Sequence, residues 1–404
     1  MIQVIATTPY TDQKMGTAGL RKKSKVVMQE HYFENFLQSI FNTIDPAGKT
    51  FVVGGDGRFY NSIAIQKLIK MAAANGVKKL IVGQNGFLST PASSNMILKR
   101  RTDGGFVLSA SHNPGGENGD FGIKFATETG GQCSSLVSDR IFAVSQTISE
   151  FKTVDAADID LSRLGMQNLE GMEIEIVDPI SDYVELMEKI FDFELIKKMF
   201  ADGFTMRFDA MNAVTGPYAI RIFEEILGAA KGSVLNAVPK PDFGGLHPDP
   251  NLVYAKELVN IMYADDAPDF GAANDGDGDR NMILGKKFFV TPSDSLAILT
   301  DNYDLIPAYK GGIYGVAKSM ATSTAVARVA SARNIGYYEV PTGWKYFVNL
   351  MDSKRMRRGK LRHRLQPYPR KRRHLGGFVL AQHHSRHRQK RGRNHPRTLA
   401  EIRP

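Results

Sequence analysis

The sequence contains a single cysteine, Cys133, among 404 residues. One cysteine excludes any disulfide within the chain, and scarcity of cysteine is typical of proteins in a reducing compartment. No apolar run approaches the roughly 18 residues that a membrane-spanning helix needs. Residues 1–8 carry neither the basic segment nor the apolar core of a secretory signal peptide. These absences predict a cytoplasmic protein with no membrane partner.

Acidic residues outnumber basic residues in most of the chain, although the formal net charge of the whole is +10. Residues 354–404 hold 18 of the 52 Lys and Arg residues but only one acid, Glu401. The preceding 353 residues therefore contain 34 basic and 41 acidic residues, a net charge of −7. Any nucleic-acid binding would depend on this tail alone, and the tail contains no recognition motif. We expect no specific nucleic-acid partner, only salt-sensitive binding of polyanions.

Segments typical of strands and helices alternate before the tail, and the length allows two to four domains. The predicted strands are 50–55, 78–83, 104–109, 206–211, 270–274, 288–292 and 313–317. The predicted helices are 61–75, 180–191, 215–227 and 295–302. This alternation predicts successive α/β layered domains with a largely parallel sheet, in which ligands bind at the carboxyl ends of the strands.

The sequence changes character at Ser353. Arg, Lys, His and Pro dominate residues 354–404, and the only apolar stretch among them is 375–381. A segment so rich in charge cannot bury a core, so we predict that this tail is disordered.

A serine follows one of the predicted buried strands. The apolar run 105–108 ends in a polar stretch at 109–113, and residues 114–116, Pro-Gly-Gly, predict a turn. At the exit of a buried strand Ser111 would be held rigidly yet open to a ligand, as a nucleophile or a carrier of a phosphoryl group requires. The alternative is a polar loop whose side chains satisfy local backbone groups. His112 could orient the serine or accept a proton, or be an ordinary hydrogen-bonded loop histidine.

Three carboxylates occupy alternate positions directly after the predicted strand 270–274: Asp275, Asp277 and Asp279. The glycines between them allow the backbone to curl so that the carboxylate oxygens converge. Because such carboxylates repel one another, a divalent cation is their natural occupant, and so few protein oxygens suit Mg²⁺ better than a full Ca²⁺ cage. An EF-hand is excluded because its sixth position requires Gly and is Arg280 here. A solvated acidic turn is the remaining alternative.

Cations near these two loops would complete a phosphate site. Arg280 could pair with a phosphate through its planar guanidinium. Residues 14–23 could present backbone N–H groups and Arg21 to a phosphate, or form a solvated loop. Lys124 alternates with apolar residues near Ser111 in sequence, but it could equally be an edge-strand lysine.

Together these segments resemble the phosphoglucomutases of the α-D-phosphohexomutase superfamily. The resemblance covers roughly residues 1–352, and its most specific parts are the serine loop and the acidic loop. The matching segments, in order, are 12–22, 83–91, 110–125, 247–252, 275–280 and 340–345. Three small departures touch no charged position: Ala18, Leu246 and Ala321, where the family has Ser, Gly and Pro.

The resemblance implies a role for each matching residue. Ser111 matches the serine that carries the phosphoryl group, and His112 lies beside it. The positions that match Mg²⁺ ligands are Asp275, Asp277, Asp279 and the phosphoserine itself. The positions that match contacts to the sugar phosphate or the transferring group are Arg21, Lys124, Arg280 and Thr342.

The implied activity is the interconversion of α-D-glucose 1-phosphate and glucose 6-phosphate through glucose 1,6-bisphosphate, with Mg²⁺ as cofactor. The expected partners are small-molecule sugar phosphates, and the expected state is a monomer. The implied domains are of the phosphohexomutase type: domain I at 1–180, domain II at 181–290 and a partial domain III at 291–353. A non-native basic tail at 354–404 follows.

Two parts of the family pattern are missing after Trp344. They are a sugar-binding loop, Cys-Gly-Glu-Glu-Ser-Phe-Gly-Thr-Gly, and a fourth domain. Residues 356–365 can be encoded as ATG CGG CGA GGA AAG CTT CGG CAC CGG CTC, and the same bases read one position later encode this loop. Residues 395–403 likewise admit a shifted reading, Ile-Arg-Glu-His-Trp-Arg-Lys-Phe-Gly, which is similar to the family.

We therefore interpret residues 354–404 as translated in a shifted frame that begins between about Ser353 and Met356. A coding sequence with incompatible codons would contradict this interpretation. The leading hypothesis is a phosphoglucomutase, impaired in this chain because the sugar-binding loop and the fourth domain are missing. The alternatives are a phosphomannomutase or another phosphohexomutase, and a non-catalytic relict that binds sugar phosphates.

Overall fold

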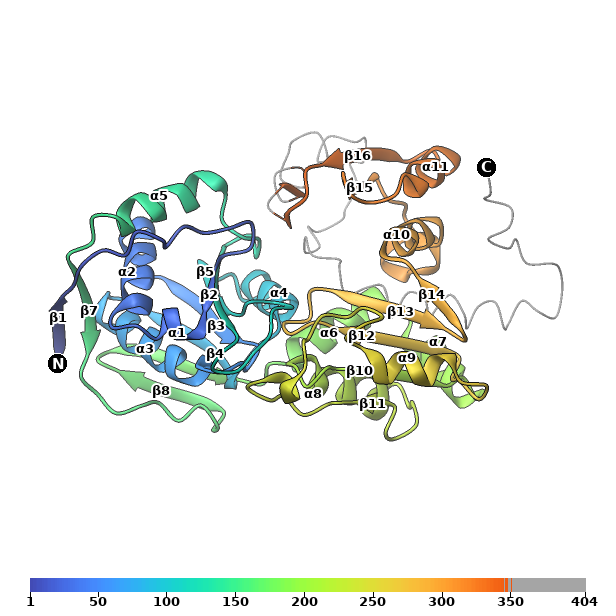
Figure 1. Ribbon diagram of the computed structural model, residues 1–404, viewed down its shortest axis with the longest axis horizontal. Helices are drawn as coiled ribbons and strands as arrows, with labels where there is room; N and C mark the ends of the chain where they lie inside the picture. The colour runs from blue at the N-terminus through green and yellow to red at the C-terminus, as the bar shows by residue number, and fades with distance from the viewer. Residues whose placement is uncertain (345, 348–349, 351–404) are drawn as a thin grey trace.

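The structure is a computed structural model that describes residues 1–344, 346–347 and 350. Figure 1 shows mixed α/β units in chain order, with the first on the left, the second at the lower right and the third above the second. The predicted α/β fold class is thus confirmed. The predicted disorder of residues 354–404 and the proposed frame change fall outside the described residues. None of the helices described is long and apolar enough to span a membrane.

A seven-stranded sheet forms the first unit. The strand order is β2 (Leu20–Lys23), β6 (Asp120–Thr127), β5 (Gly104–Leu108), β3 (Thr50–Gly55), β4 (Lys79–Phe87), β9 (Met172–Val177) and β8 (Gly165–Leu169). The central strands β5, β3, β4 and β9 run parallel, whereas β2, β6 and β8 are antiparallel to their neighbours.

The expectation of a largely parallel sheet is therefore correct only for its centre. A parallel partner requires a long crossover connection, and short connections return the chain antiparallel. The segment between β8 and β9 is only Glu170 and Gly171, both with positive φ as in a tight hairpin.

Alternate residues of the central strands enter two different cores. Phe51 and Val53 pack into one core with the helices α2 (Tyr32–Ile44) and α3 (Asn61–Ala74). Val52 points to the other face and packs with α4 (Thr90–Arg100). This second core continues without a break into α6 (Ser181–Ile190), α7 (Phe193–Ala201) and the second sheet. The first two units therefore share a core, which holds them in a fixed arrangement relative to each other.

A five-stranded sheet forms the second unit. Its order is β11 (Val234–Leu235), β10 (Met206–Asp209), β12 (Phe270–Asn274), β13 (Asn281–Gly285) and β14 (Phe288–Val290), parallel up to β12 and antiparallel after it. Its further helices are α8 (Thr215–Ala219), the π-helix η1 (Ile220–Ile226), the 3₁₀-helix η2 (Phe243–Gly245) and α9 (Lys256–Tyr263). The predicted helix at 215–227 is thus helical, but its second half is a π-helix.

The third unit pairs β15 (Gly315–Ser319) with β16 (Gly336–Val340) in parallel. The helices α10 (Pro292–Asp301) and α11 (Ala325–Ala332) accompany them, with short 3₁₀ turns η3 (Tyr303–Leu305) and η4 (Pro307–Tyr309). Helix α10 begins three residues earlier than predicted. The Thr291 hydroxyl caps it by accepting a hydrogen bond from the amide of Asp294, and Pro292 occupies the first helical position. The remaining elements are β1 (Ile2–Ala6), its antiparallel partner β7 (Glu150–Val154), α1 (Ser24–Val27) and α5 (Ser135–Ser145).

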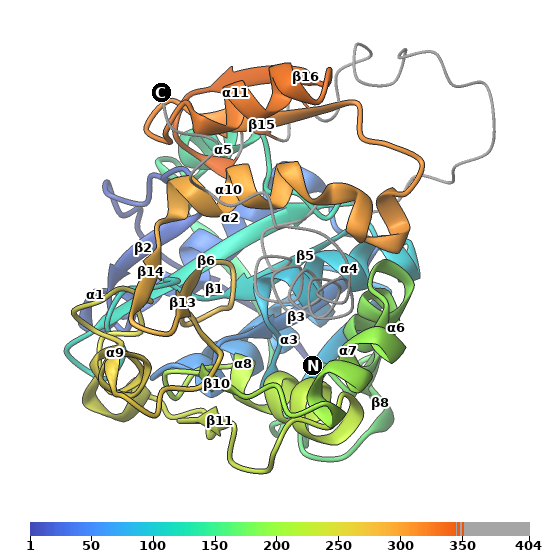
Figure 2. The ribbon, with the colours of Figure 1, turned by 90° about the vertical axis from the view of Figure 1, so that its right-hand side faces the viewer.

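Polar loops gather at the carboxyl ends of the parallel strands of both sheets. The loop that contains Ser111 follows β5, and the acidic loop 275–280 follows β12. In Figure 2 the second unit lies in front of the first, and the third unit is at the top of the view. The facing strand ends of the first two units therefore form the candidate site.

Candidate active site

Ser111 lies three residues beyond the end of β5. Its φ of 57° falls in the left-handed region, which costs a residue other than glycine about 1–2 kcal/mol. Its hydroxyl donates a hydrogen bond of 2.6 Å to Oδ2 of Asp275. Only 1% of the residue is exposed. The serine is held firmly, as expected, but the expectation that it is open to a ligand is wrong, because the Asp275 carboxylate covers its hydroxyl.

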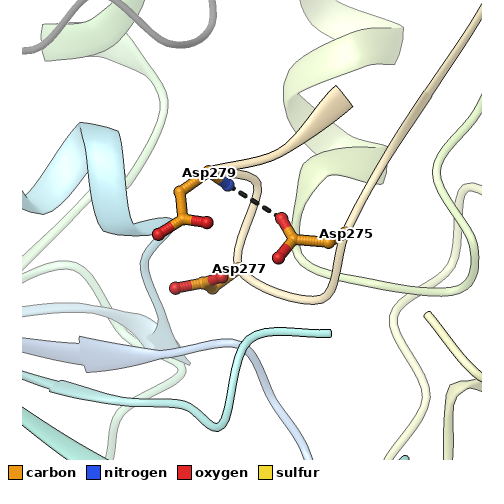
Figure 3. Close-up of side chains that lie close together, drawn as sticks. All are labelled: Asp275, Asp277 and Asp279. Atoms are coloured by element: carbon orange, nitrogen blue, oxygen red, sulfur yellow. Dashed lines mark hydrogen bonds between the residues drawn. The ribbon is translucent and has the colours of Figure 1, made fainter. Parts of the chain in front are cut away.

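The three predicted ligand carboxylates converge, as Figure 3 shows. One oxygen from each of Asp275, Asp277 and Asp279 lies within 4.8 Å of the others. The loop closes around the first of them, since the amides of Asp279 and Arg280 both donate to Oδ1 of Asp275, at 2.9 and 3.0 Å. Asp275 and Asp277 are completely buried. The alternative of a solvated acidic turn is therefore wrong.

The buried carboxyls of this loop differ in how readily they ionise. Burial, together with the charges of Asp277 and Asp279, raises the pKa of Asp275 well above its usual range. Burial also opposes the charge of Asp277, but the ammonium of Lys124 outweighs it and lowers the pKa of Asp277 below the usual range. One carboxylate is thus neutralised by a cation of the protein, and another resists ionisation.

The acidic loop has the features that a metal-binding site requires. Oδ1 of Asp277 is buried, and no donor among the described residues reaches it. A bound divalent cation would satisfy this oxygen and would favour the ionised form of Asp275. The donors are all carboxylate oxygens, which suit a hard cation such as Mg²⁺.

Lys124 approaches the acidic loop from the first unit. It belongs to β6, which lies between β2 and β5, and it is 3% exposed, so the edge-strand alternative is wrong. Its ammonium pairs with Asp277 and, at 3.7 Å, with Asp279. The acidic loop therefore meets its main countercharge across the boundary between the two units.

Thr90, the first residue of α4, forms hydrogen bonds with the acidic loop. Its hydroxyl donates to the carboxylate of Asp277 and accepts a hydrogen bond of 3.2 Å from Lys124. Its amide donates to the carbonyl of Asp277 at 3.0 Å. Both the side chain and the main chain of Asp277 are thus fixed by residues of the first unit.

Two predicted arginines lie around this cluster. Arg21 is in β2, beside β6, and Asp277 and Asp279 are within its electrostatic reach. Burial lowers the pKa of its guanidinium, although an arginine remains charged at neutral pH. Arg280 ends the acidic loop with an exposed side chain, close enough for its charge to act on Arg21.

His112 is half-buried beside Ser111. Burial, and then the charge of Arg280, lower its pKa to about 4, so the imidazole is neutral at pH 7. Its Nδ1 is buried without a hydrogen-bond partner among the described residues. Its ring lies nearly parallel to that of His247, with centroids 6.4 Å apart. A neutral ring next to the serine fits the predicted position, but it is a weak proton acceptor.

Thr342 belongs to the third unit, whereas the other predicted site residues belong to the first two units. It is exposed, in the loop that follows β16. A Cβ at the neighbouring Gly343 would come within 3.3 Å of the methyl group of Thr17. The loop of Thr342 therefore approaches the segment that carries Arg21, on the side of the site that the third unit faces.

The sequence analysis missed three residues of this site. Asp56 and Arg58 follow β3 and form a completely buried ion pair of 2.8 Å, and Arg58 contacts the main chain of Ser111. Their place just after a predicted strand, at the same edge as the serine, was a usable signal. Thr90 follows β4 in the same way, but a lone threonine near a helix start is equally typical of ordinary capping.

Family comparisons match most of the chain. Sequence models described as "Phosphoglucomutase/phosphomannomutase, alpha/beta/alpha domain I", "domain II" and "domain III" match residues 12–152, 181–287 and 292–360. A phosphoglucomutase of Rhizobium radiobacter is 57% identical over 354 residues, covering 87% of this chain and 65% of that protein. A chloroplastic phosphoglucomutase of Brassica napus is 53% identical over 357 residues, covering 87% of this chain and 57% of that protein. The chain thus spans about three fifths of the length of these relatives.

Solved structures agree with these matches. The open form of parafusin, a phosphoglucomutase of Paramecium, superposes with a TM-score of 0.90 at 42% identity, covering 99% of this chain and 75% of that one. A putative phosphomannomutase of Thermus thermophilus superposes with a TM-score of 0.73 at 20% identity, covering 98% of this chain and 83% of that one. The second likeness shows the shared fold alone.

Proposed function

The chain belongs to the phosphoglucomutase/phosphomannomutase family, and from this premise we propose that it interconverts α-D-glucose 1-phosphate and glucose 6-phosphate through a phosphoserine at Ser111. The observation that carries the proposal is the hydrogen bond from the Ser111 hydroxyl to Asp275 within a buried cluster of carboxylates and Lys124. We propose a glucose phosphate rather than a mannose phosphate as the substrate, because the relatives at 57% and 53% identity are phosphoglucomutases.

In the proposed transfer, the bond between phosphorus and Oγ of phosphorylated Ser111 breaks while phosphorus bonds to a hydroxyl oxygen of the hexose phosphate. The proton of that hydroxyl ends on Oγ of Ser111. The product, glucose 1,6-bisphosphate, returns its other phosphoryl group to the serine in the second half of the cycle. The hydrogen bond from Ser111 to Asp275 stabilises the dephosphorylated state between the two transfers.

The metal ion of this proposal is Mg²⁺, which Asp275, Asp277, Asp279 and the phosphorylated Ser111 would hold. When bound, it would supply positive charge that stabilises the negative oxygens of the phosphoryl group. Lys124 does the same from the protein, since it is fixed against Asp277 with almost no exposure. Thr90 keeps both residues in place.

Arg21, Arg280 and Thr342 are proposed to contact the sugar phosphate or the transferring group. The exposed guanidinium of Arg280 and the loop of Thr342 face solvent, from which a substrate must enter. His112 is proposed to orient Ser111 through its neutral ring. Its low pKa argues against a permanent positive charge at this position.

We further propose domain boundaries at 1–180, 181–290 and 291–353, a monomeric state and a cytoplasmic location. The boundaries are supported by the separate sheets of the three units. Sugar phosphates are the proposed partners, in keeping with the names of the relatives.

The test is a coupled assay that measures glucose 6-phosphate formed from glucose 1-phosphate, with and without added glucose 1,6-bisphosphate. The proposal expects slow turnover, in keeping with the impairment inferred from the sequence, that the bisphosphate stimulates and that Ser111→Ala abolishes. Turnover that survives Ser111→Ala would contradict it. A matched control is Ser93→Ala, because the Ser93 hydroxyl is also buried but lies on α4 without a hydrogen-bond partner among the described residues.

A further inference from the structure

The main chain of Ser111 is held on both sides by residues that have no proposed role in the transfer. Its amide donates a hydrogen bond of 2.7 Å to Oγ of Ser109, which in turn donates to Oδ2 of Asp56 at 2.6 Å. Its carbonyl accepts a hydrogen bond of 2.8 Å from Nη2 of Arg58. Asp56, Arg58 and Ser109, here called the clasp, thus reach the peptide groups before and after the serine.

Arg58 commits its whole guanidinium to this arrangement. Nε donates to the carboxylate of Asp56 at 2.9 and 3.0 Å, and Nη2 lies 2.8 Å from Oδ2. Nη1 donates to the carbonyl of Asp120 at 2.8 Å and to that of Asn113 at 3.4 Å. The carbonyls of Ser111 and Asn113 lie in the first half of the loop between β5 and β6, and Asp120 is the first residue of β6. One side chain therefore ties the first half of the serine loop to the start of β6.

The cost of burial indicates that this pair does more than stabilise the fold. Both side chains of the Asp56–Arg58 pair are 0% exposed. Such a pair seldom stabilises a protein more than apolar residues of equal size would, because desolvation opposes the attraction between the charges. The pair instead fixes the positions of neighbouring groups, because the five N–H donors of a planar guanidinium can bind three carbonyls and a carboxylate at once.

The clasp also connects the serine to the acidic loop of the second unit. A Cβ at Gly276 would lie 2.5 Å from the carbonyl oxygen of Ser111 and 3.4 Å from Nη2 of Arg58. The ring of Phe243, also from the second unit, lies 5.2 Å from the guanidinium. The carbonyl of Ser111 is therefore enclosed between Arg58 and the loop that bears the carboxylates, which leaves its peptide little room to rotate.

We propose that Asp56, Arg58 and Ser109 are positioning residues for phosphoryl transfer. They hold Ser111 in its left-handed conformation, which aims its hydroxyl at the carboxylate cluster. The inference rests on the proposed phosphoserine at Ser111, but the geometry that it concerns can be measured without any transfer. Relaxation of the serine backbone toward ordinary φ values would move Oγ away from the carboxylates, and misplacement by about 1 Å is enough to slow a reaction by about 100-fold.

The decisive variant is Ser109→Ala, because it removes one buried hydroxyl and leaves the Asp56–Arg58 pair in place. Removal of either charged residue would leave an unpaired buried charge and risk unfolding. The control is again Ser93→Ala, equally buried but outside the network. The full chain is incubated with glucose 1,6-bisphosphate and Mg²⁺, and phosphate on Ser111 is followed over time by mass spectrometry.

For Ser109→Ala we expect the rate constant of phosphorylation at saturating bisphosphate to fall by about 10- to 100-fold. The bisphosphate concentration for half-maximal rate should change less than about twofold, because the clasp touches no proposed substrate-binding residue. Ser93→Ala should match the parent chain in both quantities. An unchanged rate constant for Ser109→Ala, or an equal fall in Ser93→Ala, would overturn the inference.

Hydrogen exchange of the Ser111 amide provides a readout that does not depend on transfer. Its exchange should accelerate at least about tenfold in Ser109→Ala and stay unchanged in Ser93→Ala, because the amide loses its acceptor only in the first. Unchanged exchange in Ser109→Ala would overturn the inference even if phosphorylation were absent. Failure of the parent chain to become phosphorylated would instead contradict the proposed function, so the two failures are distinguishable.

Discussion

The hydroxyl of Ser111 lies 2.6 Å from the carboxylate of Asp275, although 164 positions separate the two residues in sequence. The two residues lie in loops that follow strands of different sheets, β5 and β12, and each of these strands has a parallel neighbour. The contact exists because the first two units share one core and bring the carboxyl ends of these strands together. The proposed chemistry depends on this junction between units.

Replacement of Lys124 by Met should destabilise the chain by about 3–5 kcal/mol, because Asp277 would become a buried charge without its main partner. The measurement is urea unfolding without divalent ions. Combining the change with Asp277→Asn should recover most of the loss, since the unpaired charge is then gone. Lys23→Met, at an exposed ion pair, should cost less than about 1 kcal/mol. Equal losses in the two lysine variants would contradict this account of Lys124.

Mg²⁺ should stabilise the parent chain against unfolding by about 2.7 kcal/mol at 100 times its dissociation constant, and a chelator should remove this gain. Asp279→Asn should abolish most of the gain while leaving the metal-free stability almost unchanged, because Asp279 is partly exposed. Thermal unfolding with and without Mg²⁺ measures both effects. A Mg²⁺ gain as large in Asp279→Asn as in the parent would show that the ion binds elsewhere.

Gly276→Ala should disturb the contact between the acidic loop and the serine loop through a steric clash, without any change of charge. The new methyl group would meet the backbone carbonyl of Ser111 at 2.5 Å, and backbone cannot move aside cheaply. We expect a loss of about 1–3 kcal/mol in stability together with weaker Mg²⁺ binding. Gly285→Ala is the control, because its methyl group would meet its nearest neighbour, Phe288, at an ordinary 3.9 Å. If both variants behave alike, the packing of Gly276 against the serine loop is not important.

Acid should weaken the contact between α4 and α6, in which Asp182 pairs with Lys99 at 2.8 Å and with Arg100 at 3.0 Å. Burial opposes the charge of Asp182, but hydrogen bonds from these two cations outweigh it and lower its pKa. A lowered pKa in the folded state means that the stabilisation is complete above the usual range of aspartate, near pH 4. It is lost as the pH falls through the folded pKa.

Asp182→Asn should therefore be about 1–3 kcal/mol less stable than the parent at pH 7, with a difference that shrinks toward zero at low pH. Urea unfolding between pH 7 and pH 2 measures this dependence. Asp155→Asn, at an exposed position, should stay within about 0.5 kcal/mol of the parent throughout. A difference between Asp182→Asn and the parent that is constant with pH would contradict the assigned pKa shift.

Elements with clear periodicity could be predicted from the sequence. Strand β12 occupies the predicted residues 270–274, and β3 the predicted residues 50–55, because short apolar runs between turn residues have few alternatives to a buried strand. The convergence of Asp275, Asp277 and Asp279 was also predictable, since their spacing and the intervening glycines are local properties. Local signals of this kind do not depend on the rest of the fold.

Properties that arise from tertiary contacts could not be predicted. The burial of Ser111 depends on Asp275, and the interior position of Lys124 depends on β2 pairing with β6 from a distant part of the chain. The place of Asp56 and Arg58 after a predicted strand indicates the edge of the sheet at which they lie, but their contacts with the serine loop appear only in the folded chain. The antiparallel edge strand β8 depends on its short connection to β9 rather than on hydrophobic pattern.

The most direct test of the central proposal is the mass of the chain after incubation with glucose 1,6-bisphosphate and Mg²⁺. The account predicts one added phosphate, located at Ser111 by peptide mapping, and its removal by excess glucose 1-phosphate with formation of the bisphosphate. The phosphate should not appear on the Ser111→Ala variant and should appear on the Ser93→Ala variant as on the parent. No added phosphate on the parent, or a phosphate at another residue, would contradict the proposal that Ser111 carries the phosphoryl group.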